Sequence, residues 1–174
     1  MKVTVNAGHA PMGVPDPGAI NLITGDRECD YALKVANLVQ RYLNDAGVIA
    51  QVIQNDSLGY ICDVSNEFGS DAFVSIHCNA FDTHARGTEV WYKTERGATL
   101  ANCIQKQLLT SIQTVDRGIK QTDTLWVLNQ TEAVAALVEV GFIDNMDDLK
   151  MMQSNMDAIA RAIARGITDY QGVM

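Results

Sequence analysis

Three residues that could take part in metal chemistry each stand at the end of an apolar run. His9 follows residues 3–8, His77 follows 72–76, and Glu139 follows 133–138. If these runs are buried parallel strands, their carboxyl ends meet at one edge of an open α/β sheet, where such folds bind their ligands. Two imidazoles and a carboxylate at that edge predict a metal-dependent hydrolytic site.

A third metal ligand is needed, because a catalytic zinc site uses three protein ligands and leaves one position for water. The candidates are the acids that follow the first strand, Asp16, Asp26, Glu28 and Asp30. Spacing favours Glu28, since it opens the first expected helix just after the loop that begins at His9. An acid in a first helical turn also complements the helix dipole without any metal, so this alternative stays open.

Glu139 ends the most apolar run of the chain. A carboxylate there is costly to desolvate unless a metal, a proton or hydrogen-bond donors accompany it. Burial would raise its pKa, which suits a general base next to a metal-bound water. The structural alternatives are a glutamate that reaches solvent or one that pairs with Arg117. His84 lies in a polar loop and is expected to be exposed.

The elements that must position these residues alternate along the chain. Apolar runs predict strands near 2–7, 48–54, 71–77, 88–92, 125–128 and 134–140. Helical periodicity predicts helices near 27–46, 57–68, 95–115 and 154–171, with a short helix near 146–152. This alternation predicts an α/β fold: a single domain with a largely parallel twisted sheet of about six strands and helices on both faces.

Composition narrows the functional class. The chain has 174 residues, 47% of them hydrophobic, and a formal net charge of −8, so we expect one globular domain that does not bind nucleic acid. No window approaches the ~20 apolar residues of a membrane span. The four cysteines form no C-x-x-C motif, which argues against a structural zinc site and for reduced thiols. We expect a monomer made in the cytoplasm without a visible signal peptide.

Taken together, these residues fall into motifs that resemble the zinc-dependent N-acetylmuramoyl-L-alanine amidases of the Amidase_3 family. The resemblance covers about residues 2–171. Its motifs are Asn6-Ala7-Gly8-His9, Asp16-Pro17-Gly18-Ala19, Gly25-Asp26-Arg27-Glu28, Ser75-Ile76-His77-Cys78-Asn79-Ala80, Gly87-Thr88-Glu89-Val90-Trp91-Tyr92, Arg117-Gly118 and Glu139-Val140-Gly141-Phe142-Ile143-Asp144-Asn145. Each motif alone is weak, but their order and spacing together are specific.

The resemblance implies one Zn²⁺ held by His9, Glu28 and His77, with Glu139 as the catalytic glutamate. It implies hydrolysis of the amide between N-acetylmuramic acid and L-alanine in peptidoglycan, by an autolysin or a phage endolysin that acts on the wall after release or secretion. The chain departs from the family pattern at Asn6, Ala10, Asn129 and Val134. These departures leave the four site residues unchanged and bear on the contacts with substrate.

Three further residues are candidates for those contacts. Asn79 lies two positions after His77, so it points to the same face if the strand continues. Arg86 and Arg117 could bind carboxylates of the stem peptide. We expect residues 1–174 to form a single amidase catalytic domain without a separate wall-binding domain. The alternatives are a zinc peptidase that acts on the stem peptide and a non-catalytic wall-binding module.

Overall fold

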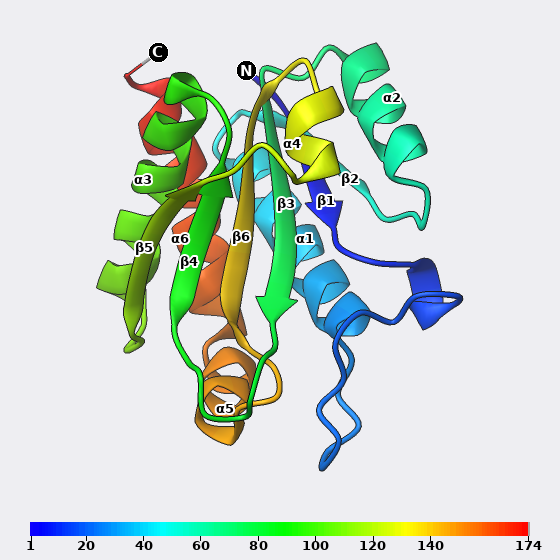
Figure 1. Ribbon diagram of the computed structural model, residues 1–174. Helices are drawn as coiled ribbons and strands as arrows, with labels where there is room; N and C mark the ends of the chain where they lie inside the picture. The colour runs from blue at the N-terminus through cyan, green and yellow to red at the C-terminus, as the bar shows by residue number, and fades with distance from the viewer. Residues whose placement is uncertain (174) are drawn as a thin grey trace.

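A six-stranded sheet forms the centre of the molecule, in the order β2-β1-β3-β6-β4-β5 (Figure 1). The computed structural model describes residues 1–173. The strands are β1 (Lys2–Ala7), β2 (Ile49–Ile53), β3 (Ala72–Asn79), β4 (Thr88–Tyr92), β5 (Asp116–Gln121) and β6 (Val134–Phe142). Strands β2, β1, β3 and β6 are parallel to one another. Strand β4 runs antiparallel to β6, and β5 is parallel to β4. The expected, largely parallel sheet of six strands is confirmed.

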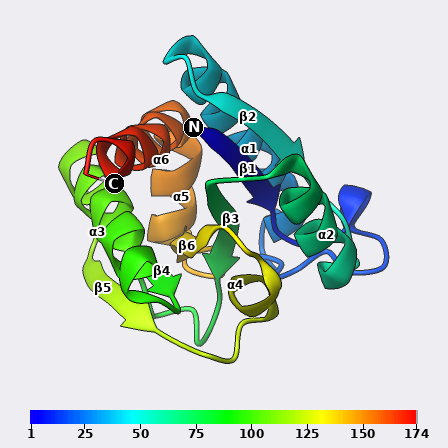
Figure 2. The same ribbon diagram turned by 90° about the horizontal axis from the view of Figure 1, so that it is seen from above.

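Helices cover both faces of this sheet, as expected (Figure 2). The helices are α1 (Glu28–Asp45), α2 (Leu58–Phe68), α3 (Glu95–Ser111), α4 (Trp126–Gln130), α5 (Met146–Ser154) and α6 (Met156–Gln171), with a 3₁₀ turn at Pro11–Gly13. Helices α1, α3 and α6 bury their apolar sides against one face and form the larger core. Helices α2 and α4 cover part of the opposite face.

The alternation of side chains along β3 and β6 explains where the polar residues lie. Val74 and Ile76 point into the larger core, and Phe73 points to the α2/α4 face. Because successive residues of a strand face opposite sides, His77 and Glu139 also point to the α2/α4 face. The residues that α2 and α4 cover precede these two in β3 and β6. On that face, α2 and α4 do not cover the carboxyl ends of the two strands, and polar side chains occupy these positions.

The secondary structure differs from the prediction at three places. The expected strand at 125–128 is wrong: α4 occupies this segment, because Val127 and Leu128 pack onto β3 and β6 as one helical turn. A short apolar run fits a strand or a buried helix equally well. Strand β5 was not predicted, since its polar edge sequence carries Ile119 as its only large apolar residue. The helix expected over 95–115 ends at Ser111.

Two further findings concern the whole of the described chain. Within residues 1–173, no helix combines the length and the apolar composition needed to cross a membrane. All four cysteines are free thiols, as expected. Cys78 is buried in the larger core, on the side of β3 opposite His77.

Candidate metal centre

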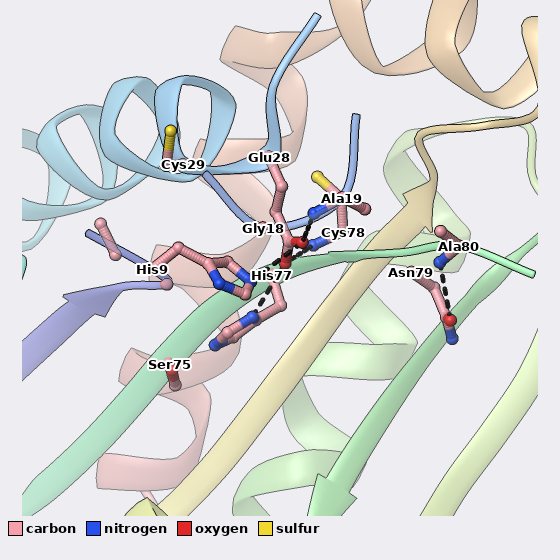
Figure 3. A network of polar contacts seen from close by, with 12 residues as sticks. His9, Gly18, Ala19, Glu28, Cys29, Ser75, His77, Cys78, Asn79 and Ala80 are labelled. Atoms are coloured by element: carbon pink, nitrogen blue, oxygen red, sulfur yellow. Dashed lines mark hydrogen bonds and ion pairs between the residues drawn. The ribbon is translucent and has the colours of Figure 1, made fainter. Parts of the chain in front are cut away.

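Three side chains from three separate elements converge on one point (Figure 3). His9 lies in the loop after β1, Glu28 is the first residue of α1, and His77 lies in β3. Their ligand atoms all lie within 4.8 Å of one another. One carboxylate oxygen of Glu28 is 2.9 Å from His9 Nε2, and the other is 2.9 Å from His77 Nδ1. The sequence thus places three potential ligands of a single cation together.

The carboxylate of Glu28 is fixed by the backbone as well as by the histidines. Its two oxygens accept hydrogen bonds from the backbone N–H groups of Ala19 and Cys78, each at 2.9 Å. Burial alone would raise the pKa of Glu28, but the hydrogen bonds and charges of His77 and His9 outweigh it and hold the pKa well below its usual range. The side chain is therefore an anion in a buried, preorganised position.

His9 adopts a backbone conformation that residues other than glycine rarely take, with φ at 66°. Asp16 Oδ2 lies 2.7 Å from Nδ1 of the His9 ring, and the other ring nitrogen, Nε2, faces Glu28. A carboxylate behind a histidine is a common way to orient a metal ligand. Burial lowers the pKa of His9, but Glu28 and Asp16 more than compensate and raise it to about 9.

The remaining acids considered as a third ligand lie elsewhere. Asp30 forms an ion pair with Arg27, and Asp26 accepts a hydrogen bond from Gln153. Asp16 contacts His9 from behind rather than joining the cluster of ligand atoms. Among the four candidates, the structure brings only Glu28 to both histidines. Sequence spacing did not reveal the contact between Asp16 and His9, because loop residues 10–27 have no periodicity to follow.

Two glycines make room for this cluster. A Cβ on Gly8 would collide with the ring of His77, lying only 2.7 Å from its Nδ1. A Cβ on Gly18, whose φ is +68°, would lie 2.6 Å from Glu28 Oε2 and 2.7 Å from His9 Nε2. The backbone therefore approaches the three side chains more closely than any other residue type would permit.

Glu139 lies beside His77 in the neighbouring strand, since the two residues are register partners in β3 and β6. Its Oε2 is buried and has no hydrogen-bond partner within residues 1–173. Burial raises the pKa of Glu139 to about 7, although His77 opposes the shift. A cation would bind the three potential ligand atoms of His9, Glu28 and His77, and its water would give the unpartnered oxygen of Glu139 a hydrogen bond. The residues therefore fit a metal ion.

The candidate substrate residues lie on both sides of this point. Asn79 continues β3 and points to the same side as His77, where its Nδ2 donates to Glu89 Oε1 at 3.3 Å. Arg86 lies in the exposed loop before β4 and pairs with Asp147 at 3.4 Å. Arg117 does not pair with Glu139; its Nε lies 2.6 Å from Glu89 Oε2. His84 is exposed, as expected.

The sequence did not predict that Glu89 would be a buried carboxylate with several polar partners. This carboxylate lies in β4 opposite Glu139, and its side chain is only 2% exposed. Burial would raise its pKa, but Lys120 and Arg117 outweigh that and lower it. The signal was a charged residue inside an apolar strand, between Thr88 and Val90, which requires a partner when buried.

Fold and site together define a class: a single-domain α/β protein with a His-Glu-His cluster that could hold a metal ion at the carboxyl edge of its sheet. Residues 3–169 match the family described as N-acetylmuramoyl-L-alanine amidase, Amidase_3. The chain belongs to this family.

Two relatives are similar to the chain in sequence. The chain is 39% identical over 127 residues to an uncharacterized cell wall amidase of Bacillus anthracis, a match that covers 66% of this chain and 24% of the relative. It is 34% identical to the uncharacterized protein YqiI of Bacillus subtilis, over 97% of this chain and 84% of YqiI. The chain thus spans about a quarter of the first relative and most of the second.

The solved structures include a similar fold. The N-acetylmuramoyl-L-alanine amidase AmiC2 of Nostoc punctiforme superimposes with a TM-score of 0.90 at 28% identity. The superposition covers 99% of this chain and 97% of AmiC2.

Proposed function

We propose that this chain hydrolyses the amide bond between N-acetylmuramic acid and L-alanine in peptidoglycan, with one zinc ion as cofactor. The observation that carries the proposal is the convergence of His9, Glu28 and His77 beside the buried, unpartnered oxygen of Glu139. Membership of the amidase family supports the choice of bond. Residues 1–174 would act as one catalytic domain on the cell wall.

His9 Nε2, one oxygen of Glu28 and His77 Nδ1 would hold the ion, because these atoms face one another. A zinc ion bound there supplies a water of lowered pKa and polarises the amide carbonyl. Asp16 keeps the ring of His9 in the orientation that leaves Nε2 free to bind. The backbone amides of Ala19 and Cys78 hold the Glu28 carboxylate in place.

Glu139 is the general base and then the general acid. Its carboxylate accepts the proton of the attacking water and delivers it to the nitrogen of the departing alanine, which leaves as a free amine. A pKa of about 7 suits both steps, because the group exchanges a proton readily near neutral pH. Proton transfer by a positioned side chain contributes about 10²- to 10⁴-fold in rate.

The substrate contacts extend this assignment. Asn79 points to the face of β3 that carries His77, so it can donate to the substrate beside the reacting carbonyl. Arg117 and Arg86 lie on the β4/β5 side of Glu139, and we assign both to the anionic stem peptide. Ion pairs with Glu89 and Asp147 hold the two guanidinium groups.

Two substitutions test the proposal on purified peptidoglycan. Glu139→Gln should keep zinc at one ion per chain and lose at least about 10²-fold in rate, since the base is removed and the ligands remain. His77→Ala should lose both zinc and hydrolysis. Metal analysis and release of new amino termini measure the two effects. Hydrolysis by Glu139→Gln at the wild-type rate would refute the role of Glu139 as base.

The competing function is a zinc peptidase that cuts within the stem peptide, which would use the same site chemistry. Mass spectrometry of the products separates the two activities. The amidase releases peptides with a free N-terminal alanine and leaves free lactyl groups on the sugar. Products cut between two amino acids would replace the amidase assignment with the peptidase.

A further inference from the structure

Glu89 holds an unusual excess of positive partners for one buried carboxylate. Arg117 Nε and Lys120 Nζ both lie 2.6 Å from its Oε2. Trp91 Nε1 and Asn79 Nδ2 donate to its Oε1 at 3.1 and 3.3 Å. Because two cations share one anion, this group keeps a net charge of +1. We call Glu89, Arg117 and Lys120 the cationic cluster.

The cationic cluster lies next to Glu139, on the side away from the histidines. Glu139 is the register partner of His77 on one side and of Glu89 on the other. Arg117 and Lys120 belong to β5, two strand spacings or about 10 Å beyond β6. Both side chains are 33% exposed, so they remain accessible to a ligand.

Arg117 and Lys120 also retain unused hydrogen-bonding capacity. Only Nε of the Arg117 guanidinium bonds to Glu89, and within residues 1–173 its terminal nitrogens make no hydrogen bond. A guanidinium presents donors in a fork that matches a carboxylate. The cluster is therefore oriented by Glu89 while its outer donors stay free for an anion.

A different surface lies on the other side of the metal centre. A cavity of about 260 Å³ opens beside His9 and His77, with walls that include Leu58, Ile61 and Trp126. The Trp126 side chain is large, apolar and 54% exposed at the start of α4. A half-exposed aromatic ring in the wall of a cavity is suited to an uncharged ring of the substrate rather than to a carboxylate.

From this asymmetry we infer the direction in which substrate crosses the site: the saccharide occupies the Trp126 cavity, and the acidic second residue of the stem peptide binds Arg117 and Lys120. This inference rests on the proposed function. The order of the strands supports it, because the charged ends of both cations meet Glu89 in β4, one strand spacing or about 5 Å beyond Glu139, a length that one or two extended residues span. The charge also supports it, because an anionic peptide needs a positive contact on a chain of net charge −8.

Glu89 is a positioning residue in this scheme. It touches neither the reacting amide nor the metal ligands, and it acts by holding Arg117 and Lys120 side by side. Lys120 is the more informative of the two for a test, because its removal leaves Glu89 paired with Arg117. The buried carboxylate then keeps a cation, and the fold is not burdened with an unpaired charge.

The experiment measures binding rather than turnover, so it does not depend on hydrolysis. Zinc-loaded Glu139→Gln protein is titrated with two muramoyl tetrapeptides, one with the glutamate carboxyl free and one with it amidated. The free acid should bind roughly tenfold more tightly. Adding Lys120→Gln should abolish this preference, Lys120→Arg should restore it, and Arg161→Gln on the distant surface of α6 should leave it unchanged.

The saccharide end is tested with a lactoyl tetrapeptide that lacks the sugar. In the same background, Trp126→Ala should weaken binding of the muramoyl peptide roughly tenfold and leave binding of the lactoyl peptide unchanged. Ile49→Ala, an exposed apolar side chain on β2, is the matched control. The inference fails if Lys120→Gln weakens both tetrapeptides equally or if Trp126→Ala weakens the lactoyl peptide as much. Failure of the proposed function would instead appear as a wild-type enzyme that binds these ligands but releases no alanine terminus.

Discussion

At the scale of the residue, the site depends on the way Glu28 uses both carboxylate oxygens. Each oxygen accepts one backbone N–H and faces one imidazole nitrogen, so the two histidines are aligned through a single side chain. An amide in its place would turn an NH₂ group toward a backbone donor. The first residue of α1 thus aligns two histidines, His9 and His77, that are 68 positions apart in the sequence.

The charge of His9 should change when metal binds. In the metal-free protein its pKa is raised to about 9, because Glu28 and Asp16 outweigh the effect of burial, so the ring is protonated at pH 7.5. A histidine binds a metal through a neutral imidazole, so zinc should displace this proton. NMR titration of the chelated protein should show the His9 ring titrating near pH 9, and zinc should remove that titration.

The same shift has a consequence for stability. A raised pKa stabilises the metal-free fold below pH 6.5, the ordinary value, and this contribution is lost as the pH rises through 9. Asp16→Asn is the control, because it removes one of the two carboxylates that raise the pKa and should lower the titration midpoint. A His9 ring that is neutral at pH 7.5 in chelated protein would contradict this account.

At the scale of the element, the loop between β1 and α1 is held to the end of β6 by Asn21. Its Oδ1 accepts hydrogen bonds from Ile23 and Thr24, and its Nδ2 donates to the carbonyl of Ile143 at 2.8 Å. The side chain is buried although it lies in a loop. These contacts position the neighbouring backbone of Gly18 and Ala19 against Glu28.

Replacing Asn21 should therefore weaken both the fold and the metal site. Asn21→Ala leaves the buried carbonyl of Ile143 without its donor, which we expect to cost about 2 kcal/mol in the free energy of unfolding. Zinc affinity should fall as well, because Ala19 no longer holds Glu28 as firmly. Denaturant unfolding and competition with a chelator measure the two effects.

The adjacent residue supplies the control for this substitution. Leu22 is 95% exposed at the tip of the loop, so Leu22→Ala should change neither quantity by more than about 0.5 kcal/mol. Equal behaviour of the two variants would show that the loop is not an anchor for the site.

The elements also show how far sequence alone reaches. Strong patterns, such as the apolar run of β3 and the helical periodicity of α1, predicted the elements that carry His77 and Glu28. The polar edge strand β5 gave no such pattern, so pairing of Arg117 with Glu139 stayed open as an alternative, and the pairing of Arg117 with Glu89 was not predicted. Pairing between Glu89 and β5 is a long-range contact, and no local periodicity encodes it.

At the scale of the whole molecule, the net charge and the local charge beside the site have opposite effects on an anionic substrate. The net charge of −8 repels anionic polymers, whereas the cationic cluster attracts a carboxylate at one point beside the site. Global repulsion acts over a Debye length, about 30 Å at 0.01 M salt and 10 Å at 0.1 M. The contact between the cationic cluster and a carboxylate acts over a few ångströms. Salt should therefore weaken the long-range repulsion and this short-range attraction as two separate effects.

Salt should therefore change the rate in opposite directions on two substrates. On walls that carry covalently attached anionic polymers, raising the salt from about 0.01 to 0.15 M should increase the rate roughly threefold, because the repulsion is screened. On soluble muramoyl tetrapeptides the same change should lower kcat/KM, because the contacts of Arg117 and Lys120 with the carboxylate weaken. Walls stripped of these polymers are the control and should lose the increase. A rate on polymer-bearing walls that falls with salt would mean that the acidic surface does not oppose the approach to the wall.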